Sequence, residues 1–285
     1  MAELLKGAPA AAAINARAAA DIEMLKEKGI EPCLAIVQLG NNDADTAYAN
    51  NAKKKCAAAG VTVKDVALAE DISQEALLNE IGILNDDDSV HGVLILRPLP
   101  AHISDELVCA ALKPEKDIDG ITIHSLGGVF TGENVGFAPC TAQACIEILD
   151  HYGIELKGKK VCVIGRSLVV GRPVALMALR RNATVTICNT STVDTAAHAR
   201  QAEIVIAAVG KADMVDSSYL SGDQILIDVG INVNAEGKLC GDVNKEAAEA
   251  GAAAYTPVPG GVGSVTTSVL ISHVVEAAKR SAEKK

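Results

Sequence analysis

The segment Gly158–Arg172, GKKVCVIGRSLVVGR, constrains the fold of this 285-residue chain more than any other. Its apolar run Val161–Ile164 predicts a buried parallel strand that leads into a glycine-bounded turn. A helix is predicted over Val174–Arg181, and a second β-rich run follows at Ala183–Cys188. The whole unit spans about 30 residues, which is the length of one βαβ crossover. The segment therefore predicts an α/β domain with a parallel sheet.

The turn in this unit is bounded by Gly165 and Gly171. Such a turn at a helix N-terminus presents backbone N–H groups to an anion, and the helix dipole favours negative charge there. A complete dinucleotide fingerprint would also need glycines at Ser167 and Val170, so the match is partial. The alternative interpretation is an ordinary strand-to-helix turn in which the two glycines only permit close packing.

The end of the second strand bears on which nucleotide this turn would bind. NAD sites usually place an acidic residue about 20 residues beyond the glycines, where it binds the ribose hydroxyls. Here Cys188 is followed by Asn189–Thr192 without an acid, and Arg166 lies inside the turn. A cation without the acid favours a 2′-phosphate, so NADP is predicted over NAD.

Composition limits the class of protein. No stretch of 18 residues is apolar without a charge or a helix breaker, so no membrane span is expected. The Ala-rich N-terminus contains Asn15 and Arg17 and lacks a basic leader, which predicts a helix and not a signal peptide. The eight cysteines form neither C-x-x-C pairs nor a Cys/His ligand pattern. We therefore expect reduced, mostly buried thiols, a cytoplasmic protein and no metal site.

The formal net charge of −10 argues against a nucleic-acid partner, because binding to phosphates requires a basic face. An anionic small molecule would instead need a local cationic patch, for which Lys53–Lys55 and Arg97 are the candidates. The alternative for the lysine run is a solvated helix face. Aromatic residues are few, so a flat ligand has little choice of stacking partner.

Strands and helices alternate along the chain, which predicts an α/β fold with ligands at the carboxyl ends of parallel strands. A glycine-rich connector that ends at Pro139 marks the predicted domain boundary. The predicted helices are 8–29, Asp45 or Thr46 to Ala59, one capped by Ser73, Thr141–Tyr152 and about Val265–Lys279; the further predicted strands are Cys33–Leu39, Val61–Ala69, Val90–Leu96, Ala202–Val209 and Gln224–Asn232.

The segment Lys116–Gly120 carries two carboxylates that flank one apolar residue. In an extended segment, residues i and i+2 point the same way, so Asp117 and Asp119 are candidates to share a face. The alternative is a turn with two solvated acids.

Taken in order, the motifs resemble those of the methylenetetrahydrofolate dehydrogenase/cyclohydrolase family. The resemblance covers most of the chain and is carried by the Tyr48 helix with its lysines, Arg97–Pro100, Lys116–Gly120, Pro139–Thr141, Gly165–Ser167, Val170–Pro173, Ile227–Asn232 and Pro257–Gly263. It implies two α/β domains that face each other across a cleft: a folate-binding domain over residues 1–139 and a Rossmann-type NAD(P)-binding domain over residues 140–264. It also implies that a C-terminal helix, about residues 265–285, returns to the first domain, and that the protein is a homodimer.

The resemblance implies an enzyme of one-carbon metabolism that transfers a hydride from 5,10-methylenetetrahydrofolate to NADP. A cyclohydrolase step can then convert the methenyl product to 10-formyltetrahydrofolate. In the family pattern, Tyr48 matches the ring that stacks on the aminobenzoyl group, and Asp119 matches the carboxylate that accepts two pterin N–H groups. The other implied folate contacts are Leu96, Arg97, Pro98, Leu99, Pro259, Gly260 and Gly261; the implied cofactor contacts are Thr141, Gly165, Arg166, Ser167, Val170, Gly171, Thr190, Gly210, Gly230 and Ile231.

Two departures from the family pattern affect the hydrolytic step. The family's catalytic lysine lies one helical turn after the tyrosine, where this chain has Ala52, and Leu96 replaces the family's glutamine. A general acid/base contributes about 10²- to 10⁴-fold, and water attack depends on it more than hydride transfer does. We therefore expect a dehydrogenase with weak or absent cyclohydrolase activity. The alternative is a bifunctional enzyme in which Lys54 or Arg97 takes over the role of the lysine.

Two other classes of function are alternatives. A different two-domain NADP dehydrogenase would share the Gly165 turn, but would not need Asp119 and the last glycine loop together. A non-catalytic folate-binding protein would keep Asp119 and show no turnover.

Overall fold

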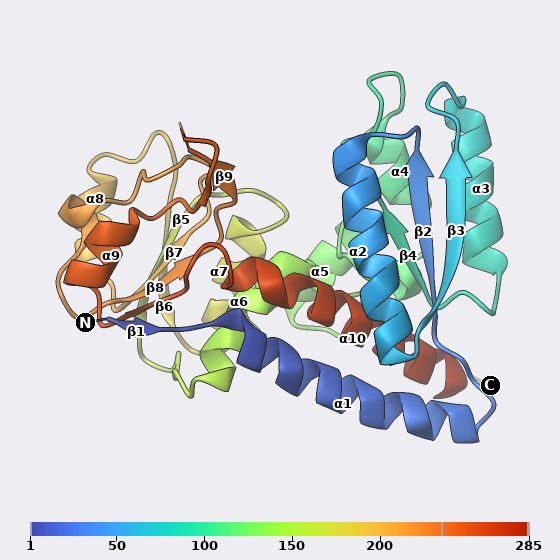
Figure 1. Cartoon of the computed structure of the whole chain (residues 1–285), viewed down its shortest axis with the longest axis horizontal. Coiled ribbons are helices and arrows are strands. Elements are labelled where there is room, and N and C mark those ends of the chain that lie inside the picture. Colours follow the sequence, from blue (N-terminus) through green and yellow to red (C-terminus); the bar gives the residue numbers. More distant parts are fainter. Residues whose placement is uncertain (1, 235, 284–285) are drawn as a thin grey trace. The chain divides into compact units, whose positions relative to one another are not determined.

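The computed structural model describes residues 2–234 and 236–283. The chain divides into two compact units (Figure 1). Among the described residues, the six-stranded unit consists of 2–13 together with Pro139–Thr266, and the three-stranded unit consists of Ile14–Ala138 together with 267–283. Two of the three boundaries fall within helices, α1 (Gly7–Glu27) and α10 (Val262–Glu283), so both helices contribute residues to each unit; the third lies just before Pro139.

The three-stranded unit is built on a parallel sheet of order β3-β2-β4. Its central strand is apolar on both faces over most of its length and is buried, as expected for a parallel sheet covered on both sides. Helices α3 and α4 pack on one face. Helix α2 lies over the other face, where it contacts β3 (Figure 1). The elements are β2 (Cys33–Leu39), α2 (Asp43–Ala59), β3 (Thr62–Leu68), α3 (Gln74–Asp86), β4 (Gly92–Ile95), α4 (Asp105–Ala111), η1 (Pro114–Lys116) and α5 (Ile123–Thr131).

The six-stranded unit holds a parallel sheet of order β1-β11-β8-β7-β5-β6. After β5 and β6 pair, the chain crosses back over β5 to form β7, so the strand order reverses between β5 and β7. Ligands of doubly wound sheets bind at such a point. The elements are β1 (Glu3–Leu4), α6 (Cys140–His151), β5 (Lys160–Ile164), α7 (Gly171–Arg180), β6 (Thr184–Cys188), α8 (Thr195–Arg200), β7 (Ile204–Ala207), η2 (Ser217–Tyr219), β8 (Ile225–Asp228), β9 (Asn232–Val233), β10 (Leu239–Cys240), α9 (Lys245–Gly251) and β11 (Ala254–Tyr255).

The α/β class and the parallel sheets predicted from the sequence are confirmed. Residues 2–13, expected in the first domain, cluster with the six-stranded unit, where β1 pairs in parallel with β11. The strand predicted over Gln224–Asn232 ends early, because the carboxylate of Asp228 accepts the N–H of Gly230 and turns the chain there. All eight cysteines are free thiols, and five of them are buried. No helix among the described residues is both long enough and apolar enough to cross a membrane.

Candidate active site

The turn after β5 is shaped by two glycines that leave no room for a side chain. Gly165 has φ +124°, and a Cβ placed there would overlap the carbonyl oxygen of Ala208, just after β7. A Cβ at Gly171 would overlap the carbonyl oxygen of Gly165. The end of β5, the start of α7 and the loop after β7 are therefore packed backbone against backbone at the point where the strand order reverses.

The N–H groups at the start of α7 are not all open, contrary to the prediction from the turn pattern. The Oγ of Ser167 accepts hydrogen bonds from the N–H of Val170 at 3.1 Å and of Gly171 at 3.3 Å. Ser167 therefore satisfies two N–H groups where the turn enters α7, whose N-cap residue is Val170. Arg166, beside it, is exposed and is the cation that the turn presents.

The loop after β6 is held by its own polar side chains. The N–H of Asn189 donates to Thr192 Oγ1 at 2.9 Å, and the N–H of Ser191 donates to Asn189 Oδ1 at 3.0 Å. The next acid along the chain, Asp194, is occupied as the N-cap of α8, where it accepts the N–H of Ala197 at 3.0 Å. Thr190 is exposed in this loop. The carboxylate that would bind ribose hydroxyls is absent at this strand end.

A buried carboxylate that the sequence analysis missed holds the loop after β7. Asp242 is fully buried. Its two oxygens accept the backbone N–H groups of Val209 at 2.6 Å, Gly210 at 3.0 Å and Lys211 at 2.9 Å. They also accept the side-chain amide of Asn232 at 2.9 Å. Gly210 and the segment beside Ile231, both predicted to contact the cofactor, are thus tied to one side chain.

A second buried carboxylate, Asp228, lies at the end of β8. It accepts the N–H groups of Gly230 at 2.9 Å, Asp242 at 3.0 Å and Val243 at 3.0 Å. Burial raises its pKa to about 6, opposed by these hydrogen bonds. Ile231 is left 68% exposed at the strand end. A signal was present in the sequence, since Asp228 ends the apolar run that begins at Ile225.

The proline- and glycine-rich loop before α10 is anchored to the N-terminal segment within the six-stranded unit. The N–H of Gly7 donates to the carbonyl oxygen of Gly260 at 2.8 Å. Ser264 donates its Oγ–H to the carbonyl oxygen of Gly261 at 2.7 Å. Pro259 and Gly260 are exposed, and Gly261 is buried. This loop is therefore held in shape, with two of its three predicted folate contacts accessible.

In the three-stranded unit, the two carboxylates of the Lys116–Gly120 segment have different environments. Asp117 is fully buried and accepts the N–H of Ile121 at 3.0 Å and of Thr122 at 2.8 Å, and the hydroxyl of Ser125 at 2.6 Å. Asp119 is half-buried. The extended-segment hypothesis is therefore wrong: the segment is a turn in which Asp117 is a structural acceptor, and Asp119 is the carboxylate that stays accessible.

This turn is held on the α2 face of the sheet. A Cβ at Gly92 would lie 2.8 Å from the side chain of Ile118 and 3.2 Å from that of Val274 of α10. Ile118 therefore packs over β4, on the face shared with Leu94 and Leu96, because alternate residues of a strand point the same way. The carbonyl oxygen of Ile118 also lies 2.8 Å from Nδ1 of His273.

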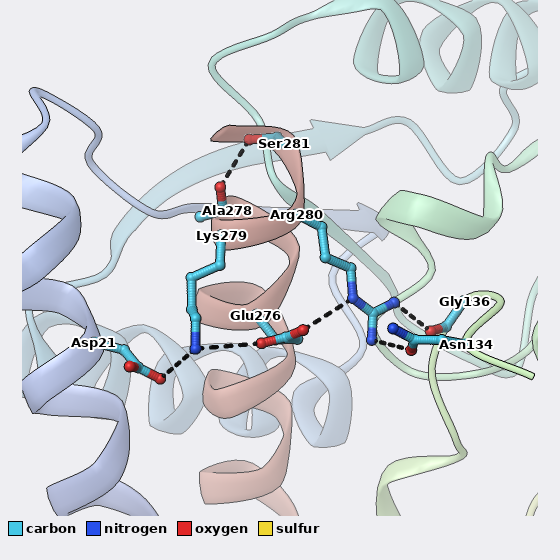
Figure 2. Close-up of polar contacts among 8 residues, drawn as sticks. All are labelled: Asp21, Asn134, Gly136, Glu276, Ala278, Lys279, Arg280 and Ser281. Carbon is cyan, nitrogen blue, oxygen red and sulfur yellow. Dashed lines mark hydrogen bonds and ion pairs between the residues drawn. The ribbon is translucent and has the colours of Figure 1, made fainter. Parts of the chain in front are cut away.

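Helix α10 is fastened within this unit by two cations. Figure 2 shows Arg280 donating to the carbonyl oxygen of Gly136 at 3.0 Å and to Asn134 Oδ1 at 2.6 Å, while Lys279 pairs with Asp21 of α1 at 3.1 Å. Glu276 accepts from both cations. The guanidinium carbon of Arg280 also lies 4.4 Å from the centre of the Phe137 ring. These contacts fasten the C-terminal part of α10 within the three-stranded unit.

Helix α2 has no cation at the position one turn after Tyr48. The Tyr48 side chain is 39% exposed, whereas Ala52 is 1% exposed. Lys53 forms an ion pair with Asp65 of β3 at 2.6 Å. Lys54 is exposed and forms no ion pair with any residue that the structure describes. The lysine run is thus partly a salt-bridged and partly a solvated helix surface.

The residues after β4 point to opposite faces of the sheet. Leu96 is buried on the α2 face. Arg97 forms an ion pair with Asp105 of α4, and its Nη1 lies 3.8 Å from Cys109 Sγ, so its guanidinium lies on the α4 face. Beyond them, Pro98 and Leu99 line a cavity of about 570 Å³ at the carboxyl ends of the three strands. A cavity at this edge agrees with the position predicted for the ligand.

Comparison with known proteins bears on both units. Residues 5–119 match the catalytic domain of the tetrahydrofolate dehydrogenase/cyclohydrolase family, and residues 139–282 match its NAD(P)-binding domain. The chain belongs to this family. The bifunctional protein FolD of Clostridioides difficile (strain 630) is 44% identical over 277 residues, which are 97% of this chain and 96% of that relative.

Two solved structures of the family share the whole fold. The crystal structure of the bifunctional enzyme FolD, methylenetetrahydrofolate dehydrogenase/cyclohydrolase, from Campylobacter jejuni has a TM-score of 0.95 and 38% identity, covering 98% of this chain and 99% of that one. The Trypanosoma brucei N5,N10-methylenetetrahydrofolate dehydrogenase-cyclohydrolase (FolD), complexed with NADP and an inhibitor, has a TM-score of 0.91 and 34% identity, covering 99% and 98%.

The predicted site residues of this family member are divided between the units. The three-stranded unit carries Tyr48, Lys54, Leu96, Arg97, Pro98, Leu99 and Asp119, and the six-stranded unit carries Pro259–Gly261 and all ten predicted cofactor contacts, with Thr141 in the first turn of α6. The division follows the family's separation into a catalytic and an NAD(P)-binding domain.

Proposed function

We propose that this protein is an NADP-dependent 5,10-methylenetetrahydrofolate dehydrogenase, and that its cyclohydrolase activity is weak or absent. The position of Arg97 carries the second part of the proposal. Its guanidinium is paired on the α4 face, whereas the side chains at positions 52 and 96 lie on the α2 side of the sheet. Arg97 therefore cannot stand in for a cation there without breaking its ion pair with Asp105.

The choice of NADP is supported by the environment of Arg166. Its exposed guanidinium stands beside a pre-formed turn, and the loop after β6 offers hydroxyls and an amide in place of a carboxylate. A guanidinium can bind a 2′-phosphate through paired hydrogen bonds. A carboxylate in this loop would repel the phosphate and weaken its binding. The Trypanosoma brucei relative was solved with NADP. When bound, NADP supplies the hydride acceptor, and the protein supplies binding and orientation.

The folate contacts proposed for this chain follow from which groups stay accessible. Asp119 keeps its carboxylate accessible while Asp117 is buried, so Asp119 is the group able to accept pterin N–H donors. The exposed ring of Tyr48 is available for stacking on an aromatic part of the substrate. Orientation of the one-carbon bridge by such contacts is the main contribution a protein makes to hydride transfer from a reduced pterin.

The lysines of α2 do not replace the absent one by simple geometry. A helix turns about 100° per residue, so Lys54 is about 200° from the direction of Ala52. Lys53 is held by Asp65. Lys55 returns close to the direction of Tyr48, but about 10 Å further along the axis. In the alternative, a bifunctional enzyme that uses Lys54, this side chain would have to reach around the helix to the side on which Ala52 lies.

The test separates the two reactions. Methylenetetrahydrofolate is supplied with NADP and then with NAD, and the formation of methenyl product is followed. Methenyltetrahydrofolate is then supplied alone, and its decay is compared with that of the buffer blank. We expect oxidation that prefers NADP and a decay close to the blank. Enzyme-dependent hydrolysis at a rate comparable to oxidation would refute the monofunctional proposal and support the bifunctional alternative.

We also propose a homodimer. Strand β6 is at the edge of the six-stranded sheet, where Ile187 is 43% exposed and Leu179, on the neighbouring helix α7, is 57% exposed. An open sheet edge that carries exposed apolar side chains suits a second copy that pairs with it about a twofold axis. Light scattering after size exclusion should give twice the chain mass, and Ile187→Lys should shift it toward the monomer; a monomeric wild type would rule the proposal out.

A further inference from the structure

Gln38 is a buried polar residue at the carboxyl end of the central strand β2. It is 8% exposed and belongs to a strand that is otherwise apolar. Burying an amide in such a strand is unfavourable unless its hydrogen bonds are made. Its presence at the edge where parallel sheets bind ligands suggests a role beyond packing.

The strand register places Gln38 directly beside Leu96. Val37 of β2 pairs with Ile95 of β4, and the N–H of Leu96 donates to the carbonyl oxygen of Val37 at 3.0 Å. The same register carried one residue further sets Gln38 against Leu96, on the neighbouring strand about 4.8 Å away and on the same face. On the other side, Gln38 pairs with Ala67 of β3. In this row of three, Gln38 is the polar side chain.

The amide is only partly used within the protein. Its Nε2 donates to Thr46 Oγ1 of α2 at 2.9 Å, which confirms that it points to the α2 face. Its Oε1 has no hydrogen-bond partner among the described residues. In the described part of the chain, Gln74 Nε2 is the buried side-chain N or O atom that lacks a hydrogen-bond partner. Gln38 Oε1 also lacks a partner but is not among the fully buried atoms, so it is accessible from solvent. The Thr46 bond fixes the amide so that this oxygen is presented.

We propose that Gln38 binds the folate substrate, with Oε1 accepting a hydrogen bond from an N–H group of the reduced pterin ring. This inference rests on the proposed function. Under this proposal, the side-chain amide at this edge of the sheet comes from Gln38 of β2, which is adjacent to Leu96 of β4. An amide serves here because it stays neutral beside a substrate whose oxidation creates a cation, and because Thr46 orients it.

The test measures KM for methylenetetrahydrofolate and for NADP in Gln38→Leu. We expect KM for the folate to rise about 10-fold, the effect of one lost hydrogen bond to a buried site. KM for NADP should stay unchanged, because the nucleotide contacts are on the other unit. Leu96→Gln in the Gln38→Leu background should recover most of the loss, because the two positions are adjacent.

Controls separate binding from structure. Gln38→Glu keeps an acceptor in place and should retain folate binding better than Gln38→Leu does. Thr46→Val removes the orienting bond alone and should have a smaller effect. Gln38→Met, which matches the shape of glutamine, replaces Gln38→Leu if that variant fails to fold.

The outcomes are distinct. An unchanged KM for folate in a folded Gln38→Leu or Gln38→Met overturns this inference while the wild type still oxidises the substrate. A Thr46→Val effect as large as that of Gln38→Leu, without rescue by Leu96→Gln, also overturns it and leaves Gln38 a structural partner of Thr46. A wild type without oxidation of methylenetetrahydrofolate would instead defeat the proposed function itself.

Discussion

His273 Nδ1 lies 2.8 Å from the carbonyl oxygen of Ile118, 155 positions earlier in the chain. A carbonyl oxygen only accepts, so Nδ1 carries the proton and donates it. The His273 ring also lies 4.9 Å from the ring of Phe137, to which Arg280 is stacked. Helix α10 therefore holds the turn whose next residue is Asp119, the proposed pterin ligand.

We predict that His273→Phe raises KM for methylenetetrahydrofolate several-fold and leaves KM for NADP unchanged. Phenylalanine keeps the contact with Phe137 but leaves the Ile118 carbonyl without its donor, which costs about 1 kcal/mol. Steady-state kinetics with each substrate varied in turn measure this. Ser272→Ala is the matched control, because Ser272 is one residue earlier and its hydroxyl donates to the carbonyl oxygen of Val269 in the same helix. Equal effects of the two substitutions would argue against a specific role for His273.

The two carboxylates of the Lys116–Gly120 turn should separate stability from binding. Asp117→Asn should lower the free energy of unfolding by about 2 to 3 kcal/mol, because an amide group cannot accept all three buried donors. Asp119→Asn should change stability by less than about 0.5 kcal/mol, as expected for a partly exposed site, and should abolish most folate binding. Urea unfolding and folate titration measure the two effects. If Asp117→Asn impaired folate binding and Asp119→Asn impaired stability, Asp119 would be the structural acceptor and Asp117 the folate ligand.

Restoring the two family residues should create hydrolysis. In the double variant Ala52→Lys with Leu96→Gln, we expect methenyltetrahydrofolate hydrolysis to increase by about 10²-fold or more over the wild type, the contribution of one general acid/base. Ala52 is 1% exposed, so part of the lysine stem would be buried and its amine would have to extend toward the site. Arg97→Leu should leave hydrolysis unchanged. If the wild type hydrolyses methenyltetrahydrofolate and Arg97→Leu abolishes that activity, Arg97 contributes to hydrolysis.

The cofactor preference should depend on Arg166. Arg166→Ala should lower the ratio of kcat/KM for NADP to that for NAD by about 10-fold or more, since a charge-assisted hydrogen bond contributes about 1.5 to 3 kcal/mol. The exposed Arg172, in the first turn of α7, provides Arg172→Ala as a control of equal charge change. An unaltered ratio in Arg166→Ala would remove this residue from the 2′-phosphate site.

Asp228 should make stability depend on pH. Its pKa is raised from 3.8 to about 6, chiefly by burial, so the folded state favours the neutral acid. Its contribution to stability is therefore fully present below pH 3.8 and is lost as the pH rises through about 6. Relative to Asp228→Asn, which does not titrate, the wild type should lose up to about 3 kcal/mol across this window. Urea unfolding at a series of pH values would reveal it, and a constant difference between the two proteins would contradict it.

Local residue patterns along the chain determined the elements and the class of fold. The apolar runs at Cys33–Leu39 and Val161–Ile164 are buried strands with a neighbour on each side, and Ser73 is the N-cap of α3 as predicted. These features depend on neighbours in sequence, through periodicity and capping. The motifs also identified the family, because their residues and their order along the chain can be read from the sequence without knowledge of the fold.

Contacts between distant segments decided the rest, since they depend on which strands and helices become neighbours in space. The pairing of β1 with β11 places the N-terminal residues in the six-stranded unit, and the Asp242 cluster joins three segments that are separate in sequence: Val209–Lys211, Asn232 and Asp242. Which of Asp117 and Asp119 is buried, which face Arg97 takes, and that Gln38 stands beside Leu96 are likewise set by strand register and helix packing. Sequence alone named the candidate chemistry, while the tertiary structure selected the side chains able to perform it.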